Sequence, residues 1–71
     1  MTMHTVEITV GGPAYGFPFA AYAKSETAPW LNACLGMGDS PEAACTSAQQ
    51  SVRLDASRCG YEPRFTFPQS N

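Results

Sequence analysis

Three cysteines and one histidine are the residues of this 71-residue chain with the widest range of possible chemistry. A catalytic thiolate needs a nearby base and a group that orients that base. His4 is the one histidine, so a nucleophilic site would pair it with Cys34 or Cys45. We expect instead that both thiols pack as small apolar side chains, because free cysteine is among the most buried residue types.

The cysteine spacing also bears on metal and disulfide chemistry. Cys34, Cys45 and Cys59 include no Cys-x-x-Cys pair and, with a single histidine, match no zinc pattern. Cys45 and Cys59 would lie about 21 Å apart along an unbroken helix, which is too far for a disulfide. Cys34 and Cys45 could meet between a sheet and a helix, where we expect reduced thiols. We therefore expect no metal, no cofactor and a cytoplasmic chain.

The acidic residues do not indicate an acid–base or phosphate site. Asp39, Glu42, Asp55 and Glu62 form no dense loop of oxygen ligands. The segment 36–39 is faintly similar to a phosphate-binding turn, but Asp39 and Glu42 place negative charge there and no Lys or Arg follows. A chain this short rarely encloses a substrate pocket, so we expect no enzyme acting alone.

Alternating residues before position 38 predict three strands. Residues 4–10 alternate with strict period two and are rich in β-branched side chains, typical of a half-buried strand. Residues 11–16, rich in Gly and Pro, predict a turn. Residues 17–24 predict a second strand, with Pro18 at its start or on an edge. Residues 30–37 predict a third strand. Its expected apolar face consists of Leu31, Ala33, Leu35 and Met37.

The clearest local pattern predicts a helix after this third strand. Ser40 is a good N-cap, Pro41 fits the first helical position and Glu42 favours the positive end of the helix dipole. Gly60 is a typical helix stop. The expected buried stripe consists of small residues at helical spacing, Ala44, Cys45, Ala48 and Val52.

Residues 61–63 then predict a connector, and residues 64–67 a short last strand. The element order β-β-β-α-β predicts an α+β fold, a small antiparallel sheet with one helix packed on one face. We expect a single domain over residues 1–71, with an ordered core of about residues 4–67.

The charge and length of the chain limit the classes of molecule that it is expected to bind. Four Lys and Arg stand against six Asp and Glu, a net charge of −2, which disfavours direct binding to nucleic acid or to an anionic membrane. No apolar run approaches the roughly 18 residues of a membrane span, and the first residues do not have the pattern of a signal peptide. A core this small provides little net stability, so we expect a partner, with a homodimer as the first candidate.

The segment from Gly38 to Ala44, with the elements around it, resembles a known family. Three strands, then Gly-Asp-Ser-Pro-Glu-Ala-Ala, an Ala-rich helix and a short strand are similar to the amino-terminal domain of HicB-type antitoxins, over roughly residues 5–67. In that family this run opens the helix that covers the sheet. The turn at residues 11–16 departs from the family, and we expect no carboxy-terminal DNA-binding segment. The resemblance implies toxin-type protein binding without DNA binding.

Small size and acidic charge are also similar to those of phage inhibitors such as anti-CRISPR proteins, although no motif identifies that class. We therefore expect a non-enzymatic inhibitor that binds a larger protein or nucleoprotein complex by steric occlusion, in an anti-defence or antitoxin role. The expected anchors are the aromatic residues Tyr15, Phe19, Tyr22 and Trp30. The expected acidic rim consists of Glu7, Glu26, Asp39, Glu42 and Glu62.

Two other classes of function remain open. A structural or assembly protein of a phage or mobile element would use the same aromatic residues to associate with itself. A small enzyme subunit would use a cysteine with a perturbed pKa.

Overall fold

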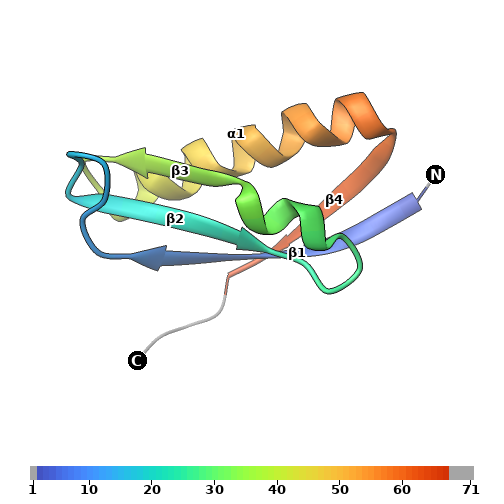
Figure 1. Ribbon diagram of the computed structural model, residues 1–71, viewed down its shortest axis with the longest axis horizontal. Helices are drawn as coiled ribbons and strands as arrows, with labels where there is room; N and C mark the ends of the chain where they lie inside the picture. The colour runs from blue at the N-terminus through green and yellow to red at the C-terminus, as the bar shows by residue number, and fades with distance from the viewer. Residues whose placement is uncertain (1, 68–71) are drawn as a thin grey trace.

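The computed structural model describes residues 2–67 as a four-stranded sheet with one α-helix (Figure 1). The elements in chain order are β1 (Thr2–Gly11), β2 (Phe19–Lys24), the 3-10 helix η1 (Pro29–Ala33), β3 (Leu35–Gly38), α1 (Pro41–Cys59) and β4 (Tyr61–Thr66). The predicted α+β class and the order β-β-β-α-β are confirmed. Residues 1 and 68–71, which flank the expected core, lie outside the described residues.

The sheet is mixed, whereas the sequence predicted an antiparallel one. Its strand order is β3-β2-β1-β4, in which β1 and β2 pair antiparallel, β2 and β3 pair antiparallel, and β4 runs parallel to β1. The direction of β4 follows from α1, whose 19 residues extend about 28 Å and return the chain to the end of the sheet where β3 begins. β4 therefore runs in the same direction as β3, and so as β1.

The predicted third strand is wrong over its first half. Residues 29–33 form η1, with Pro29 at its start and Leu31 fully buried, and only Leu35–Gly38 is strand. The predicted apolar face of this strand is also reversed. Gly36 and Gly38 are buried against α1, while Leu35 and Met37 are half-buried on the other face. Glycine faces the helix because a larger side chain would not fit there.

The observed bounds of the other three strands differ less from the predicted ones. β1 is longer than predicted. Of the alternating residues on one side of this strand, Val6 and Ile8 are buried, whereas His4 is partly exposed and Val10 is 37% exposed. β2 begins at Phe19, so Phe17 and Pro18 belong to the preceding turn region. The last strand begins directly after Gly60, because residues 61–63 pair with the first residues of β1 and form no separate connector.

The ends of α1 are those that the sequence predicted. The Ser40 hydroxyl accepts a hydrogen bond from the Ala43 amide at 3.1 Å, and Pro41 occupies the first turn. At the other end Gly60 adopts φ 77° and donates its amide to the Ala56 carbonyl at 2.8 Å. One otherwise unpaired backbone group at each end of the helix, the Ala43 amide and the Ala56 carbonyl, thus acquires a partner.

The buried stripe of α1 is made of small side chains that let the helix lie very close to the sheet. Its buried members recur every four residues at Ala44, Ala48, Val52 and Ala56. A Cβ atom built on Gly36 would lie 2.1 Å from the Ala48 amide nitrogen and 2.6 Å from the Ala44 carbonyl oxygen. The helix backbone and the β3 backbone are therefore in direct contact.

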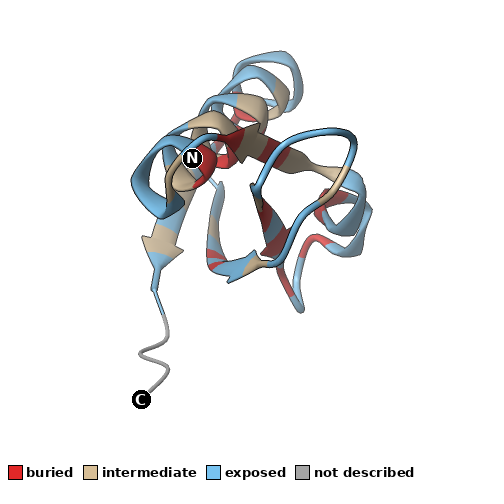
Figure 2. Cartoon of the chain, turned by 90° about the vertical axis from the view of Figure 1, so that its left-hand side faces the viewer, coloured by how far each residue is buried: buried red, intermediate tan, exposed pale blue. Residues whose placement is uncertain are grey.

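The hydrophobic core lies between α1 and the sheet and contains few large side chains. Val6, Leu31 and Val52 are its largest fully buried members, and alanine supplies much of the rest. Figure 2 shows α1 on one side of the sheet, with the buried residues on the strands, beside η1 and on the inner side of the helix. Among the described residues no helix covers the other side of the sheet, here called the open face. Within residues 2–67 no helix is long and apolar enough to cross a membrane.

Replacing Gly36 with alanine tests the direct contact between α1 and β3. We expect Gly36→Ala to lower the free energy of unfolding by about 3 kcal/mol, because the added methyl group meets helix backbone that cannot move aside. The matched control is Gly12→Ala, since a Cβ atom there meets nothing within 4 Å. Urea denaturation followed by circular dichroism measures both. Equal stability of the two variants would contradict the contact.

Candidate functional site

The four aromatic residues predicted as anchors do not lie on one surface. Tyr15 belongs to the turn between β1 and β2 and is 75% exposed, and Tyr22 is on the open face. Phe19 faces the opposite way and packs against the core. Trp30 lies on η1, beside the carboxy-terminal half of α1. The structure therefore separates the predicted anchors into different regions.

The turn that holds Tyr15 is a tight two-residue β-turn. Ala14 and Phe17 exchange two backbone hydrogen bonds, both of 3.0 Å, across Tyr15 and Gly16. Tyr15 has φ 55° and Gly16 has φ 83°. Positive φ at both central residues defines a type I′ turn, which favours Asn, Asp or Gly at the first of the two positions. Tyrosine at this position costs about 1 kcal/mol, because its Cβ crowds the following carbonyl oxygen.

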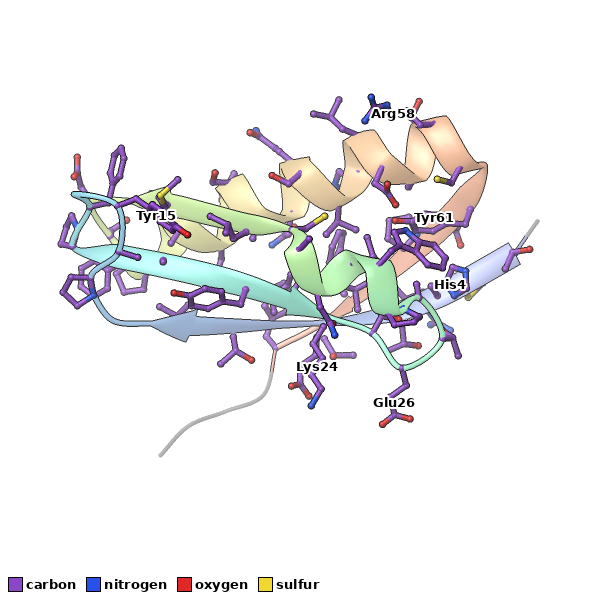
Figure 3. The ribbon with its side chains drawn as sticks, in the orientation of Figure 1. His4, Tyr15, Lys24, Glu26, Arg58 and Tyr61 are labelled. Atoms are coloured by element: carbon purple, nitrogen blue, oxygen red, sulfur yellow. The ribbon has the colours of Figure 1, made fainter. Side chains whose placement is uncertain are left out.

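Other apolar side chains are exposed near this turn. Phe17 is 43% exposed and Val10, near the end of β1, is 37% exposed. Figure 3 places Tyr15 at one end of the molecule, and His4 and Tyr61 toward the other end of its 36 Å long axis. We call residues 10–18 with their exposed side chains the hairpin tip.

Tyr22 covers part of the open face next to the hairpin tip. A Cβ atom built on Gly11 would lie 2.9 Å from Cε2 of the Tyr22 ring, so the ring lies across this glycine. Tyr22 is 41% exposed, and it thus combines a packing role with an accessible ring edge. An alanine at position 11 would displace the ring.

Trp30 belongs to a polar and aromatic cluster at the other end of the molecule. Its Nε1 donates a hydrogen bond of 2.7 Å to Oδ2 of Asp55, and the Tyr61 hydroxyl donates one of 2.8 Å to the same oxygen. The Cys59 thiol lies 3.8 Å from the other carboxylate oxygen. Asp55 was not among the predicted site residues. One general rule could have pointed to an acceptor such as Asp55. The polar atoms of buried or partly buried Trp and Tyr side chains usually need a hydrogen-bond partner.

His4 completes this cluster. Its ring meets those of Tyr61 and Trp30 edge to face, with centroid separations of 5.0 and 5.6 Å. Its Nδ1 lies 2.8 Å from the Thr27 hydroxyl oxygen. The cluster thus joins β1, the loop after β2, η1, α1 and β4, which assigns a stabilising role to Trp30 beyond any contact with a partner.

The hydrogen bonds of the cluster change the acidity of two groups. The bond from Trp30, followed by that from Tyr61, lowers the pKa of Asp55 below its ordinary value. Burial raises the pKa of Tyr61, and its hydrogen bond to the Asp55 carboxylate raises it further. Asp55 therefore stays ionised and Tyr61 stays protonated over the physiological range.

Cys34 and Cys45 do not have the surroundings of reactive thiols. Burial raises the pKa of Cys34 and of Cys45, and the charges of Asp55 and Glu42, respectively, add to the effect. Among the described residues no hydrogen bond joins His4 to a cysteine. The part of the chain from 2 to 67 also has no group of three or more His, Cys, Asp or Glu side chains arranged to hold a metal ion.

The predicted acidic residues are all exposed, but they do not form one rim. Glu7 and Glu26 line a shallow groove of about 420 Å³ on the open face, together with Lys24. Asp39 and Glu42 lie at the start of α1. Glu62 lies on β4, at the edge of the sheet. A partner that contacts all five would have to reach around the molecule.

Comparison with protein-family models, curated proteins and solved structures gives no match. The function is therefore inferred from the structure of this chain alone.

The pH dependence of stability tests the Asp55 hydrogen bonds. A carboxylate with a lowered pKa stabilises the fold above the pKa of an unfolded Asp, about 3.9, and this contribution is lost as the pH falls through the lower folded value. We expect acid to destabilise the wild-type protein more than Asp55→Asn, which should itself be about 1 kcal/mol less stable at pH 7. Fluorescence of the single tryptophan during urea denaturation reports unfolding.

The control for this experiment is Asp39→Asn, which removes an exposed carboxylate near the other end of α1. It should retain the acid sensitivity of the wild-type protein. Identical pH profiles for wild type and Asp55→Asn would show that the carboxylate contributes nothing to the fold.

Alkylation rates test the state of the thiols. We expect Cys34 and Cys45 to react with iodoacetamide at pH 7.5 more slowly than a cysteine in an unstructured peptide, because burial disfavours the thiolate. Trypsin leaves Cys34 and Cys45 on one peptide, residues 25–53, so tandem mass spectrometry of that peptide locates the label at each site, and the peptide 59–64 reports Cys59. Fast labelling of either residue that persists below pH 7 would reveal a lowered pKa and favour the cysteine-dependent enzyme subunit.

Proposed function

We propose that the protein is a non-enzymatic inhibitor that binds a larger protein or nucleoprotein complex and occludes its working surface. The supporting observation is that large apolar side chains stay accessible after folding, with Val10, Tyr15 and Phe17 together at the hairpin tip. Exposed aromatic rings are the side chains that contribute most to binding energy when a partner buries them.

The chemistry of the other candidate sites favours binding over catalysis. The groove on the open face carries two carboxylates and a lysine. The histidine beside it, whose Nδ1 lies 2.8 Å from the Thr27 hydroxyl, packs its ring against Trp30 and Tyr61 in the cluster that holds the fold together. The raised pKa values of Cys34 and Cys45 oppose thiolate chemistry. We therefore prefer the function of a binding protein to that of a cysteine-dependent enzyme subunit.

The biological setting that we propose is anti-defence or antitoxin activity in the cytoplasm. Its support is the resemblance of Gly38–Ala44 to the helix start of HicB-type antitoxins, together with the small size and net charge of −2. Asp39 and Glu42 at the start of α1, both exposed, would meet a basic nucleic-acid-binding groove of the target and steer the encounter. In this proposal the protein itself contacts neither nucleic acid nor membrane.

We also propose a homodimer, and the geometry favours the open face over the sheet edges. β3 offers an edge of only four residues, and the β4 edge contains Pro63, which has no amide hydrogen to donate. The open face instead carries Met3 and Tyr22, and the oppositely charged Glu7 and Lys24 as register partners. A two-fold axis between β1 and β2 would place Glu7 of one copy over Lys24 of the other.

Affinity purification with the tagged full-length chain tests the proposed inhibitor. We expect recovery of a nuclease or nucleoprotein complex from the cells that contain the protein, and we expect the purified chain to abolish that complex's activity at near-equal stoichiometry. The matched control is Gly36→Ala, whose weakened fold should lower the recovery of the partner. Large homomeric assemblies without a partner would contradict the inhibitor and favour the structural protein.

A further inference from the structure

The hairpin tip holds a tyrosine in a backbone conformation that this residue disfavours. Tyr15 is the one non-glycine residue with positive φ in the described part of the chain, residues 2–67. Asn, Asp or Gly would occupy this turn position with less strain. Backbone strain of this kind persists where a side chain has a function that other residues cannot replace.

Nothing within the folded monomer offsets this strain through burial. The Tyr15 ring is 75% exposed, so its packing within the chain contributes little to stability. By contrast, the rings of Tyr61 and Phe65 contribute to the core or lie against it. The benefit of a tyrosine at position 15 must therefore come from outside the monomer.

The turn holds this ring in a defined position. The two hydrogen bonds between Ala14 and Phe17 close the turn, and Pro13 and Pro18 restrict φ on either side of it. A side chain presented on such a backbone loses less conformational entropy on binding than one on a mobile loop. The turn thus has the rigidity of a preorganised anchor.

The shape of the hairpin tip decides which kind of partner it fits. Two aromatic rings bury about 150–250 Å² each at most, well below the roughly 800 Å² per partner of a stable interface. Two identical convex tips would therefore not hold a dimer together. A concave surface on a larger protein would surround Tyr15 and Phe17 and also contact the strands beside them.

We propose that Tyr15, presented by the type I′ turn, inserts into an apolar pocket of a larger protein partner, with a polar group of that pocket meeting its hydroxyl. This inference rests on the proposed function. It adds that Tyr15 is the main binding side chain and that an apolar pocket is the surface that it meets. The chain retains a strained turn because the ring that causes the strain is needed for binding.

The substitution Tyr15→Asn separates binding from stability, because asparagine suits the turn and lacks the ring. We expect its urea midpoint to rise by about 0.5 M, since the turn strain is relieved. We expect its affinity for the purified partner to fall at least about 30-fold, as for a hot-spot residue. Tyr15→Phe should lose only about 5-fold, because it keeps the ring but leaves the polar group of the pocket unpaired. The control Leu54→Ala, on the exposed side of α1, should bind like wild type.

A photoreactive benzoylphenylalanine at position 15 identifies the surface that the tip meets. We expect adducts with apolar pocket residues of the larger protein, and none from the same probe at position 54. Wild-type affinity of Tyr15→Asn, a lowered urea midpoint of that variant, or adducts between two copies of this chain would overturn the inference. A wild-type chain that forms no complex would instead contradict the proposed function itself.

Discussion

The backbone of α1 lies directly against the backbone of β3, and the rest of the structure depends on that contact. It is possible because Gly36 and Gly38 have no side chain on the face that meets Ala44 and Ala48. The narrow space between the layers is filled largely by alanine, with Val6 and a few other branched residues. A core of this thickness has little room for aromatic rings.

Two groups of rings lie instead at the ends of the molecule, where they have different roles. At one end Trp30 and Tyr61 share the Asp55 carboxylate and lie against His4, which ties five segments of the chain together. At the other end Tyr15 and its neighbours at the hairpin tip remain exposed. The first group holds the fold together, and the second is available to a partner.

Local signals in the sequence predicted the elements well, whereas long-range contacts were not predictable from it. Ser40, Pro41 and Gly60 define α1 because caps act within one turn. Leu31 to Met37 alternate as a strand would, and Pro29, which starts η1, was the signal against that interpretation. Asp55 meets Trp30 from 25 residues away, and no local pattern encodes such a pairing. The scattered acidic residues were likewise predicted as exposed, but without their positions on the fold.

This division of the aromatic residues also separates the structural requirements at the two ends of the chain's fold. The helix–sheet contact tolerates no added atoms, whereas the hairpin tip retains a residue that its backbone disfavours. The account therefore centres on one claim, that the exposed rings at the tip bind another protein. A structure of the chain bound to its partner tests it most directly. The account predicts the Tyr15 ring enclosed by the partner. A complex in which that ring stays in solvent, with the interface elsewhere, would contradict it.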